Sequence, residues 1–226
     1  GAESYVSDEV CTALLNDVPL ITHVDVLSTD PTDGTIFVQW NNPTEADLTP
    51  YAQFEYRLFR STSFSPTQFL HITTTVSLSD TSFVDSNLNT TALSYTYRVE
   101  LWGKNGNDWE FISTSDPATS IYLSIEIMSN ALALSWAEMV PWNNLIYTVY
   151  RYNSGTSIFD SIGNATEPNF IDRYLENGSN YCYFVRAKGG YFVPDTLFPL
   201  FNRSQIKCAI PLDIDPPEVP KVIFRA

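Results

Sequence analysis

The chain has few residues of the types that carry out chemistry. Among its 226 residues are three cysteines, Cys11, Cys182 and Cys208, and two histidines, His23 and His71. No serine lies in the Gly-x-Ser-x-Gly turn of a serine hydrolase, and neither a Walker loop nor a dinucleotide-binding motif is present. The histidines also lack the spacing of a metal-ligand set. We therefore expect no catalytic residue, no metal and no cofactor, and we interpret both histidines as strand or surface residues.

The acidic residues offer two further kinds of chemistry, glycoside hydrolysis and calcium binding. Hydrolysis needs two carboxyl groups held across a cleft, and two candidate pairs are Asp30 with Asp33 and Glu45 with Asp47. Both pairs fall in turn-rich segments, where acidic residues usually stabilise turns and face water. The densest acidic group, in the segment 213–218, lies beside two prolines and is interpreted as a solvated linker, with a calcium site as the alternative. The chain is therefore predicted not to be an enzyme.

The overall charge excludes two classes of partner. Twelve Lys and Arg against 26 Asp and Glu give a net charge of −14, which repels a phosphate backbone or an anionic membrane surface. No run of about 18 apolar residues is present, and the first residues lack the basic-then-apolar pattern of a signal peptide. We therefore expect no nucleic-acid partner and no membrane insertion, and either a cytosolic protein or a trimmed fragment of a longer one.

Four short blocks of sequence occur twice, in the same order. In the first half they are GTIFVQW (34–40), YRLFR (56–60), SFVDSNL (82–88) and YTYRV (95–99); in the second half they are NALALSW (130–136), YTVYR (147–151), NFIDRYL (169–175) and YCYFV (181–185). The blocks alternate apolar and polar residues as half-buried strands do, and turns rich in Gly, Pro, Asn and Asp separate them. The sequence thus predicts a duplicated all-β domain of about 95 residues per copy.

The repeated residues resemble the fibronectin type III domain. The pattern of that family is a Trp ending the second strand, a Tyr-x-Val on the third, and a Leu followed six residues later by Tyr-x-hydrophobic-x-Val. The second copy fits it with Trp136, Tyr147, Leu175 and Tyr181, whereas the first copy has one extra residue between its Leu and its Tyr, which predicts a looser corner loop. The resemblance implies an all-β fold of two tandem immunoglobulin-like sandwiches.

The same resemblance implies structural roles for four aromatic residues. Trp40, Tyr95, Trp136 and Tyr181 are expected to form the structural core of the two copies. In each copy, the Tyr ring packs inward at the start of the sixth strand, and its hydroxyl forms a hydrogen bond with the backbone of the preceding corner. We expect this tyrosine corner to be structural.

The repeat also predicts how the chain is divided. The first sandwich is expected over residues 22–117 and the second over 118–212. The segment 1–21 resembles 204–220, because both contain Ser-x-x-x-Cys followed by a linker with Asp and Pro. We therefore predict that 1–21 is the last strand and linker of a preceding sandwich, and that 213–226 is a linker or the start of a following one.

The resemblance places two of the cysteines on neighbouring strands. If Tyr181 and Tyr183 point inward, Cys182 points outward from the sixth strand, and Cys208 lies on the expected last strand. These strands pair antiparallel in a fibronectin type III sandwich, so the resemblance implies a Cys182–Cys208 disulfide, with two reduced thiols as the alternative. Cys11 aligns with Cys208, so its partner is expected in a preceding copy. The disulfide indicates an extracellular or other extracytoplasmic location.

Two aromatic clusters are candidates for ligand binding, because the loops of this fold often carry recognition. Trp102 and Trp109 flank a turn in the first copy, and they either pair across the hairpin or form a platform for a sugar or a partner protein. In the second copy, Tyr191 and Phe192 begin a long aromatic link before the last strand, and Trp142 lies on a loop expected to join them. Packing against the sheet or the neighbouring domain is the alternative for this second cluster.

The segments 141–151, 158–163 and 181–187 further resemble the repeats of large secreted surface proteins of gliding bacteria, which end in a gliding-motility-associated carboxy-terminal domain. This resemblance implies export to the cell surface and implies no reaction. We predict a non-catalytic spacer or adhesion segment of a multidomain extracytoplasmic or cell-surface protein, whose partners are the neighbouring domains of the same longer chain. The alternative is a carbohydrate- or protein-binding module that uses the aromatic loops to bind a surface glycan or a protein.

Overall fold

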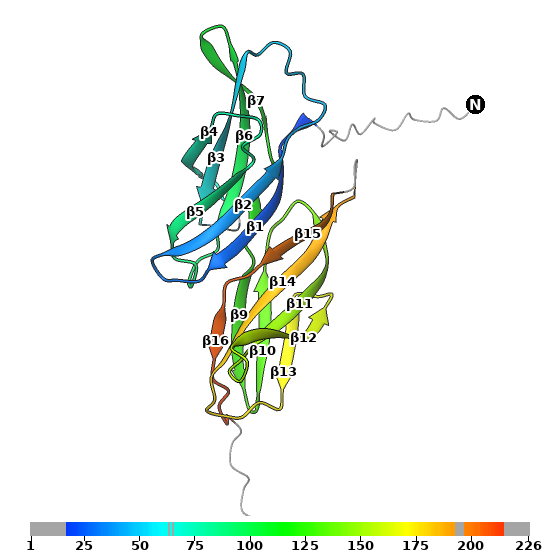
Figure 1. Cartoon of the computed structure of the whole chain (residues 1–226). Coiled ribbons are helices and arrows are strands. Elements are labelled where there is room, and N and C mark those ends of the chain that lie inside the picture. The colour runs from blue at the N-terminus through cyan, green and yellow to red at the C-terminus, as the bar shows by residue number, and fades with distance from the viewer. Residues whose placement is uncertain (1–16, 63, 65, 193–196, 215–226) are drawn as a thin grey trace, which may run out of the picture.

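The structure, a computed structural model, describes residues 17–62, 64, 66–192 and 197–214. The described residues form strands, turns and loops without an α-helix, and the strands build two β-sandwiches that follow one another along one long axis (Figure 1). The all-β fold with two tandem sandwiches, predicted from the repeated blocks, is therefore confirmed.

The first sandwich has a three-stranded sheet facing a five-stranded sheet. The small sheet has the order β1 (Leu20–Ser28), β2 (Gly34–Asn41) and β5 (Ser82–Leu88). The large sheet has the order β4 (Leu70–Thr75), β3 (Gln53–Ser61), β6 (Thr96–Asn105) and β7 (Asp108–Thr114), and β8 (Ala118–Thr119) also pairs with β6. Both sheets are antiparallel.

The second sandwich repeats this order of strands. Its small sheet has the order β13 (Asn169–Arg173), β10 (Ala131–Ala137) and β9 (Tyr122–Met128). Its large sheet has the order β12 (Ile158–Ala165), β11 (Asn143–Asn153), β14 (Tyr181–Tyr191) and β15 (Leu197–Arg203), with β16 (Lys207–Ala209) also paired to β14. The duplication seen in the sequence is thus a duplication of topology.

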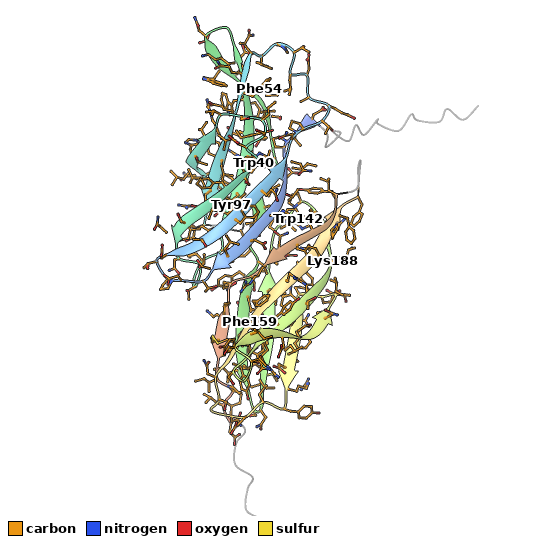
Figure 2. The ribbon with its side chains drawn as sticks, viewed as in Figure 1. Trp40, Phe54, Tyr97, Trp142, Phe159 and Lys188 are labelled. Atoms are coloured by element: carbon orange, nitrogen blue, oxygen red, sulfur yellow. A yellow bond between two sulfur atoms is a disulfide. The ribbon has the colours of Figure 1, made fainter. Side chains whose placement is uncertain are left out.

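The two sheets of each sandwich enclose the apolar residues whose alternation predicted the strands. In β2, Val38 and Trp40 are buried, while the residues between buried positions are partly exposed. Trp40 meets Tyr56 edge-on, with 5.5 Å between ring centroids, and the equivalent pair Trp136 and Tyr147 lies at 5.1 Å. Such aromatic pairs contribute about 0.5–1.5 kcal/mol beyond the burial of their area. Figure 2 labels Trp40 inside the first core.

In both sandwiches a tyrosine hydroxyl holds the corner before the sixth strand. The backbone N–H of Asn89 donates to the hydroxyl of Tyr95 at 2.9 Å, and that of Glu176 donates to Tyr181 at 3.1 Å. The donor directly follows the corner Leu in both copies, so the extra residue of the first copy lies in the loop after it. In that loop the hydroxyl of Thr90 donates to the last carbonyl of β1 at 2.9 Å. The corner keeps its geometry because the loop absorbs the insertion.

Strand pairing extends the first sandwich slightly beyond both of the boundaries that we expected. β1 begins at Leu20, within the segment 1–21 that we assigned to a preceding sandwich. Residues 118–119, which we assigned to the second sandwich, form β8 and pair with β6 of the first. The strands of the second sandwich therefore begin at Tyr122. The strand predicted around Cys11 and the linker predicted beyond residue 214 lie outside the described residues.

The disulfide predicted from strand pairing is present. Cys182 and Cys208 lie directly opposite each other in the β14–β16 ladder, with their Cα atoms 4.0 Å apart, and their sulfur atoms are bonded. Cys208 is exposed and Cys182 is partly exposed, because both occupy outward positions of alternating strands. The bridge therefore ties the second part of the last strand to its neighbour from the solvent side.

A buried serine interrupts the last strand of each sandwich. Ser115 separates β7 from β8, and Ser204 follows β15 before β16 begins. Each hydroxyl accepts a hydrogen bond from a valine N–H of the neighbouring strand, at 3.0 Å from Val99 and 2.9 Å from Val185. The serine N–H groups donate back to the carbonyls of the same valines, at 2.8 Å and 2.9 Å. The side chain thus replaces the ladder bond where the strand bends away.

Candidate functional site

The two sandwiches meet where β1 of the first lies beside β15 of the second (Figure 1). The backbone N–H of Val24 donates to Oδ1 of Asn202 at 2.7 Å, and this bond is buried. One residue further along each strand, the backbone N–H of Arg203 donates to the carboxylate of Asp25. Each strand therefore supplies one backbone donor and one side-chain acceptor. Side chains make the link in place of a strand ladder.

Two more hydrogen bonds mark the ends of this contact. The hydroxyl of Tyr191 donates to the carbonyl of Ile21 near the start of β1, at 2.9 Å. The backbone N–H of Ile206 donates to the hydroxyl of Thr29, just after the end of β1, at 2.8 Å. The joint consequently extends over the whole length of β1.

Apolar side chains of the second sandwich complete the joint. Trp142 and Tyr191 meet edge-on at 5.9 Å, and together with Leu200 they belong to the same buried cluster as Ile21 and Trp40 of the first sandwich (Figure 2). Trp142 is 5% exposed and Tyr191 is 4% exposed. Packing against the neighbouring domain, one of the two alternatives for these rings, is thus what the structure shows. A ligand cannot reach either ring while the sandwiches are joined.

Phe192 differs from the other two members of that cluster. Its side chain is 40% exposed and packs against Phe198, with 5.9 Å between the ring centroids. The sequence placed Phe192 together with Trp142 and Tyr191, but only Phe192 keeps an accessible ring.

The electrostatics of the joint are dominated by Asp25. Burial raises the pKa of this carboxyl to about 6, although the N–H of Arg203 and the charges of Arg203 and Arg186 act in the opposite direction. Burial also lowers the pKa of Arg203. The loss of water around the carboxylate therefore has a larger effect on its pKa than the nearby positive charges have.

Trp102, the first aromatic candidate in the first sandwich, is engaged by its own sheet. It lies opposite Phe111 in the β6–β7 ladder and meets that ring edge-on at 5.7 Å. The guanidinium of Arg57 lies 3.8 Å from the centre of the indole, and the indole N–H donates to Glu100 at 3.0 Å. Trp102 and Trp109 therefore do not pair across the hairpin as one of our alternatives supposed, and the Trp102 ring is held by three neighbours.

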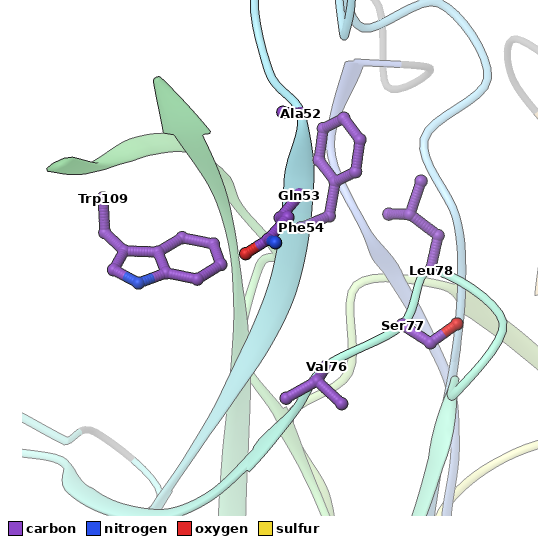
Figure 3. A pocket seen from close by; sticks show the side chains of 7 residues that line it. All are labelled: Ala52, Gln53, Phe54, Val76, Ser77, Leu78 and Trp109. Atoms are coloured by element: carbon purple, nitrogen blue, oxygen red, sulfur yellow. The ribbon is translucent and has the colours of Figure 1, made fainter. Parts of the chain in front are cut away.

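Trp109 lies beside a shallow groove at the end of the first sandwich. It is partly exposed, it faces Lys104 in the ladder, and the ammonium group of that residue lies 5.9 Å from the ring centre. The groove has a volume of about 550 Å³ and is lined by Ala52, Gln53, Phe54, Val76, Ser77, Leu78 and Trp109. Figure 3 shows the indole on one side and the side chains of Phe54 and Leu78 on the other. This arrangement can hold a sugar ring or an apolar side chain.

A buried polar network that we did not predict from the sequence occurs once in each sandwich. In the first, Arg60 and the hydroxyl of Tyr97 both donate to Asp85, at 2.8 Å and 2.9 Å. Burial and the neighbouring Asp85 raise the pKa of Tyr97, so this hydroxyl remains a donor. The repeated blocks do indicate this network, because each copy has an Arg at the end of its second block and an Asp in its third.

The second sandwich holds the equivalent network. Arg151 donates to Asp172 at 2.7 Å, and the hydroxyl of Tyr183 donates to the same carboxylate at 2.9 Å. Every strong donor in both networks has its acceptor within the sandwich. The networks stabilise the fold.

The residues that first suggested chemistry have structural neighbours. His23 contacts the Thr22 hydroxyl and His71 contacts that of Thr74. Asp30 accepts two backbone N–H bonds within its own turn, and these bonds lower its pKa. Asp47 likewise accepts from the N–H and hydroxyl two residues on. The turn role predicted for these two carboxylates is thus confirmed.

The described residues offer neither a metal-binding group nor a membrane-spanning helix. Within the described ranges, no three His, Cys, Asp or Glu side chains come together as a metal-binding group. No helix in the described part of the chain has the length and apolar character that a membrane crossing requires.

Comparison with known proteins finds matches among solved structures only. No protein-family model matches the chain, and no curated protein sequence matches it. Among solved structures, the central fibronectin-III array of a RIM-binding protein matches with 13% identity over 90% of this chain and 72% of the other, with a TM-score of 0.32. The chicken interferon gamma receptor alpha chain matches with 14% identity over 85% and 98%, with a TM-score of 0.29. A two-domain fibronectin type III segment of chicken tenascin matches with 15% identity over 80% and 98%, with a TM-score of 0.25.

These scores are low, so the strand order and the repeated residues define the class of protein. Each sandwich has a small sheet of the first, second and fifth strands and a large sheet of the third, fourth, sixth and last strands. Each also has the paired Trp and Tyr in the core and the tyrosine corner. The chain consists of two tandem immunoglobulin-like sandwiches of the fibronectin type III kind.

Proposed function

We propose that this chain is a non-catalytic spacer segment of a multidomain extracytoplasmic protein, in which it holds neighbouring domains of the same longer chain at a fixed separation and orientation. The observation that carries the proposal is the joint between β1 and β15. A flexible pair of domains needs few contacts between them, and relative motion is the usual expectation unless an interface is large and apolar.

The joint favours a fixed geometry because water can replace its hydrogen bonds only if the apolar cluster shared by the two sandwiches opens. The Val24–Asn202 bond is buried, and the adjacent rings of Trp142 and Tyr191 belong to the apolar cluster of the first sandwich. Bending the pair would expose these rings and leave a backbone N–H without its acceptor. An unsatisfied buried donor costs about 1–3 kcal/mol, and each exposed aromatic ring adds a further penalty.

The location is inferred from the disulfide. Cys208 is exposed, so the Cys182–Cys208 bond is open to reductants, and a bond of this kind persists outside the reducing cytosol. The resemblance of the second copy to repeats of secreted surface proteins of gliding bacteria supports a place on the cell surface. In that setting the fixed pair extends an adhesion protein away from its anchor.

Small-angle X-ray scattering of the whole chain tests the spacer. The scattering curve of the wild type should agree with a single joined arrangement of residues 17–214. Asn202→Ala should increase the radius of gyration and broaden the distance distribution, while Asn164→Ala, a matched change at an exposed position of the second sandwich, should leave both unchanged. A wild-type curve that requires a broad ensemble of interdomain angles would refute the fixed spacer.

A binding module is the second candidate, and the groove beside Trp109 is the observation that favours it. Its apolar walls and the neighbouring Gln53 offer one stacking surface and one amide for a ligand. A glycan array should then show binding by the wild type that Trp109→Ala abolishes. Leu93→Ala, which alters another exposed apolar side chain of the first sandwich, is the control and should retain binding. Absence of any signal across glycans and partner proteins leaves the spacer as the whole function.

A further inference from the structure

The outer face of the second large sheet carries alternating rings and cations. Tyr150 and Phe184 stack in parallel at 4.5 Å, with 9° between their planes. The guanidinium of Arg186 lies 5.3 Å from the centre of the Tyr150 ring and 5.2 Å from that of Phe201. The guanidinium of Arg203 lies 4.1 Å from the centre of the Phe184 ring. The rings thus form a platform on which both guanidinium groups rest.

The register of the strands fixes how the charges are spaced. Arg186 of β14 is directly opposite Arg203 of β15, and Lys188 follows two positions along β14. Opposite residues on one face are about 4.5–5.5 Å apart and residues two positions along a strand about 7 Å apart. The ammonium group of Lys188 lies 5.2 Å from the ring of Phe198, and Figure 2 labels Lys188 on this sheet. The three cations are therefore neighbours, with Arg203 across the ladder from Arg186 and Lys188 further along the strand of Arg186.

The corresponding face of the first sandwich is neutralised by its own carboxylates. Arg57 pairs with Glu55 at 2.6 Å, and Arg98 pairs with Glu100 at 2.8 Å. In the second sandwich, the described positions that share the outer face by register contain no Asp or Glu; they are Ile146, Thr148, Tyr150, Tyr152, Phe159, Ser161, Asn164, Phe184, Arg186, Lys188, Phe201 and Arg203. The charges of Arg186 and Arg203 lower the pKa of Asp25, a carboxylate of the first sandwich that lies within the joint.

The three cations also lack carboxylate partners at close range. Among the described residues, Arg186, Lys188 and Arg203 form no ion pair within 4.0 Å. Arg186 is exposed, so its donors face solvent. In a chain with a net charge of −14, three neighbouring cations that form no ion pair with a described residue are a local reversal of charge. Such a reversal indicates an anionic ligand.

We propose that this face, defined by Tyr150, Phe184, Arg186, Phe201 and Arg203 with Lys188 beside them, binds an acidic polysaccharide. A guanidinium that rests flat on a ring keeps its N–H donors at the edge, where carboxylate or sulfate oxygens can accept two bonds from it. Phe184 is buried, and its faces are covered by Tyr150 and by the guanidinium of Arg203. The rings therefore serve mainly to hold the cations, and the partly exposed rings of Tyr150 and Phe201 are the ones that can touch C–H groups of a sugar.

The flatness of the surface favours a polysaccharide over an acidic peptide. A peptide ligand is usually anchored by a side chain in a pocket or by strand addition at a free edge. Here the platform lies on the face of a sheet, and its rings fill the space between them by stacking on one another and on the guanidinium groups. A polymer with a negative charge on each repeating unit can contact Arg186, Arg203 and Lys188 in succession. The inference does not depend on the spacer role, because Arg186 is exposed on the outer face of the second sandwich while the sandwiches are joined.

Binding to polygalacturonate, with poly-L-glutamate and uncharged dextran as comparison polymers, tests the proposal on the whole chain. The wild type should bind polygalacturonate, should release it as salt is raised, and should not bind dextran. Arg186→Glu should weaken binding about tenfold or more, because it removes a two-bond donor and reverses a charge. Arg186→Lys keeps the charge but loses the planar donor pair, so a loss of a few-fold is expected.

Arg173→Glu is the matched control, since Arg173 is an exposed residue of β13 in the small sheet and the change in net charge is the same. It should leave the affinity within about twofold of the wild type. Equal effects of Arg173→Glu and Arg186→Glu would show that the binding depends on net charge alone, and this would refute the proposed site. Tighter binding of poly-L-glutamate than of polygalacturonate would replace the polysaccharide with an acidic protein segment, and no binding to either polymer at low salt would refute the proposal outright. Unchanged scattering curves for all variants separate these outcomes from loss of the joint.

Discussion

Asn202 of the second sandwich accepts a hydrogen bond from the backbone N–H of Val24 in the first, at 2.7 Å and out of contact with water. The two residues are 178 positions apart in the chain, and Asn202 is 2% exposed. Asn202 also begins an Asn-x-Ser acceptor sequence, and its burial leaves no room for a glycan. The relationship couples the stability of one sandwich to the other.

Replacing Asn202 by Ala should weaken that coupling. The N–H of Val24 then loses its acceptor, while the unpaired Nδ2 of Asn202 disappears with the side chain, so the net loss should be about 1 kcal/mol. Calorimetry of the wild type should show one unfolding transition, and the variant should show two that separate. Two resolved transitions in the wild type would show that the joint does not couple the sandwiches.

Asp25 should make the joint sensitive to pH. Its folded-state pKa, about 6, lies above its usual value of 3.8, so the protonated form is the one that the folded state favours. The stabilisation is complete below about pH 4 and is lost as the pH rises through about 6. Asp25→Asn keeps an oxygen for the N–H of Arg203 but cannot ionise. We expect the variant to match the wild type in free energy of unfolding near pH 4 and to exceed it near pH 7.

The comparison with Asp25→Asn also isolates the carboxyl from its neighbour His23. Burial lowers the pKa of His23, so its contribution to stability has the opposite dependence and is lost as the pH falls below about 6.5. Both chains contain His23, so its contribution cancels in the difference between them. A difference that does not change between pH 4 and pH 7 would contradict the role assigned to Asp25.

Removing the disulfide should destabilise the second sandwich. The bridge closes a loop of 26 positions, and on the chain-entropy account its loss costs about 3.5 kcal/mol. We expect the double change Cys182→Ala and Cys208→Ala to lower the midpoint of denaturant unfolding of the second sandwich, and to destabilise the first with it, because side chains of the second complete the core of the first. Titration of the oxidised, unfolded wild type should count one free thiol, from Cys11. A count of three would show that the bond does not form.

Ser204→Ala tests the serine that interrupts the last strand. Ser204 is buried, and its hydroxyl accepts from the N–H of Val185 at 2.9 Å and donates to the carbonyl of Gln205 at 2.9 Å. Removing it leaves a buried N–H without a partner, which should cost about 1–3 kcal/mol. Ser115→Ala should have a similar effect in the first sandwich. Amide exchange measures the change directly, because the Val185 N–H should lose protection in the first variant and the Val99 N–H in the second.

Local patterns in the sequence were enough to predict the strands and the duplication, and the resemblance to fibronectin type III domains implied the disulfide. Val38 and Trp40 reveal their strand because alternation depends only on neighbours along the chain. Cys182 and Cys208 could be paired because their strands are adjacent in the fibronectin type III pattern. The corner tyrosines followed from the same spacing, including the extra residue before Tyr95.

The joint could not be predicted, because no local pattern distinguishes a side chain that packs within a domain from one that packs on the next. Trp142 and Tyr191 were candidates either for ligand binding or for packing, and the structure buries them. Ser115 and Ser204 have no local signal in the sequence, since their hydroxyls act on valines in a neighbouring strand. The row of Arg186, Lys188 and Arg203 emerges only when β14 and β15 are placed in register.

The shared apolar cluster has a consequence for how this protein can evolve. Trp142, Tyr191 and Leu200 come from the second sandwich but complete the core of the first. A cut between the two sandwiches would leave a large apolar surface on each, which is a liability for a soluble domain. Gene duplication or recombination can therefore move the two sandwiches together far more readily than either one alone, and the pair is the inheritable module.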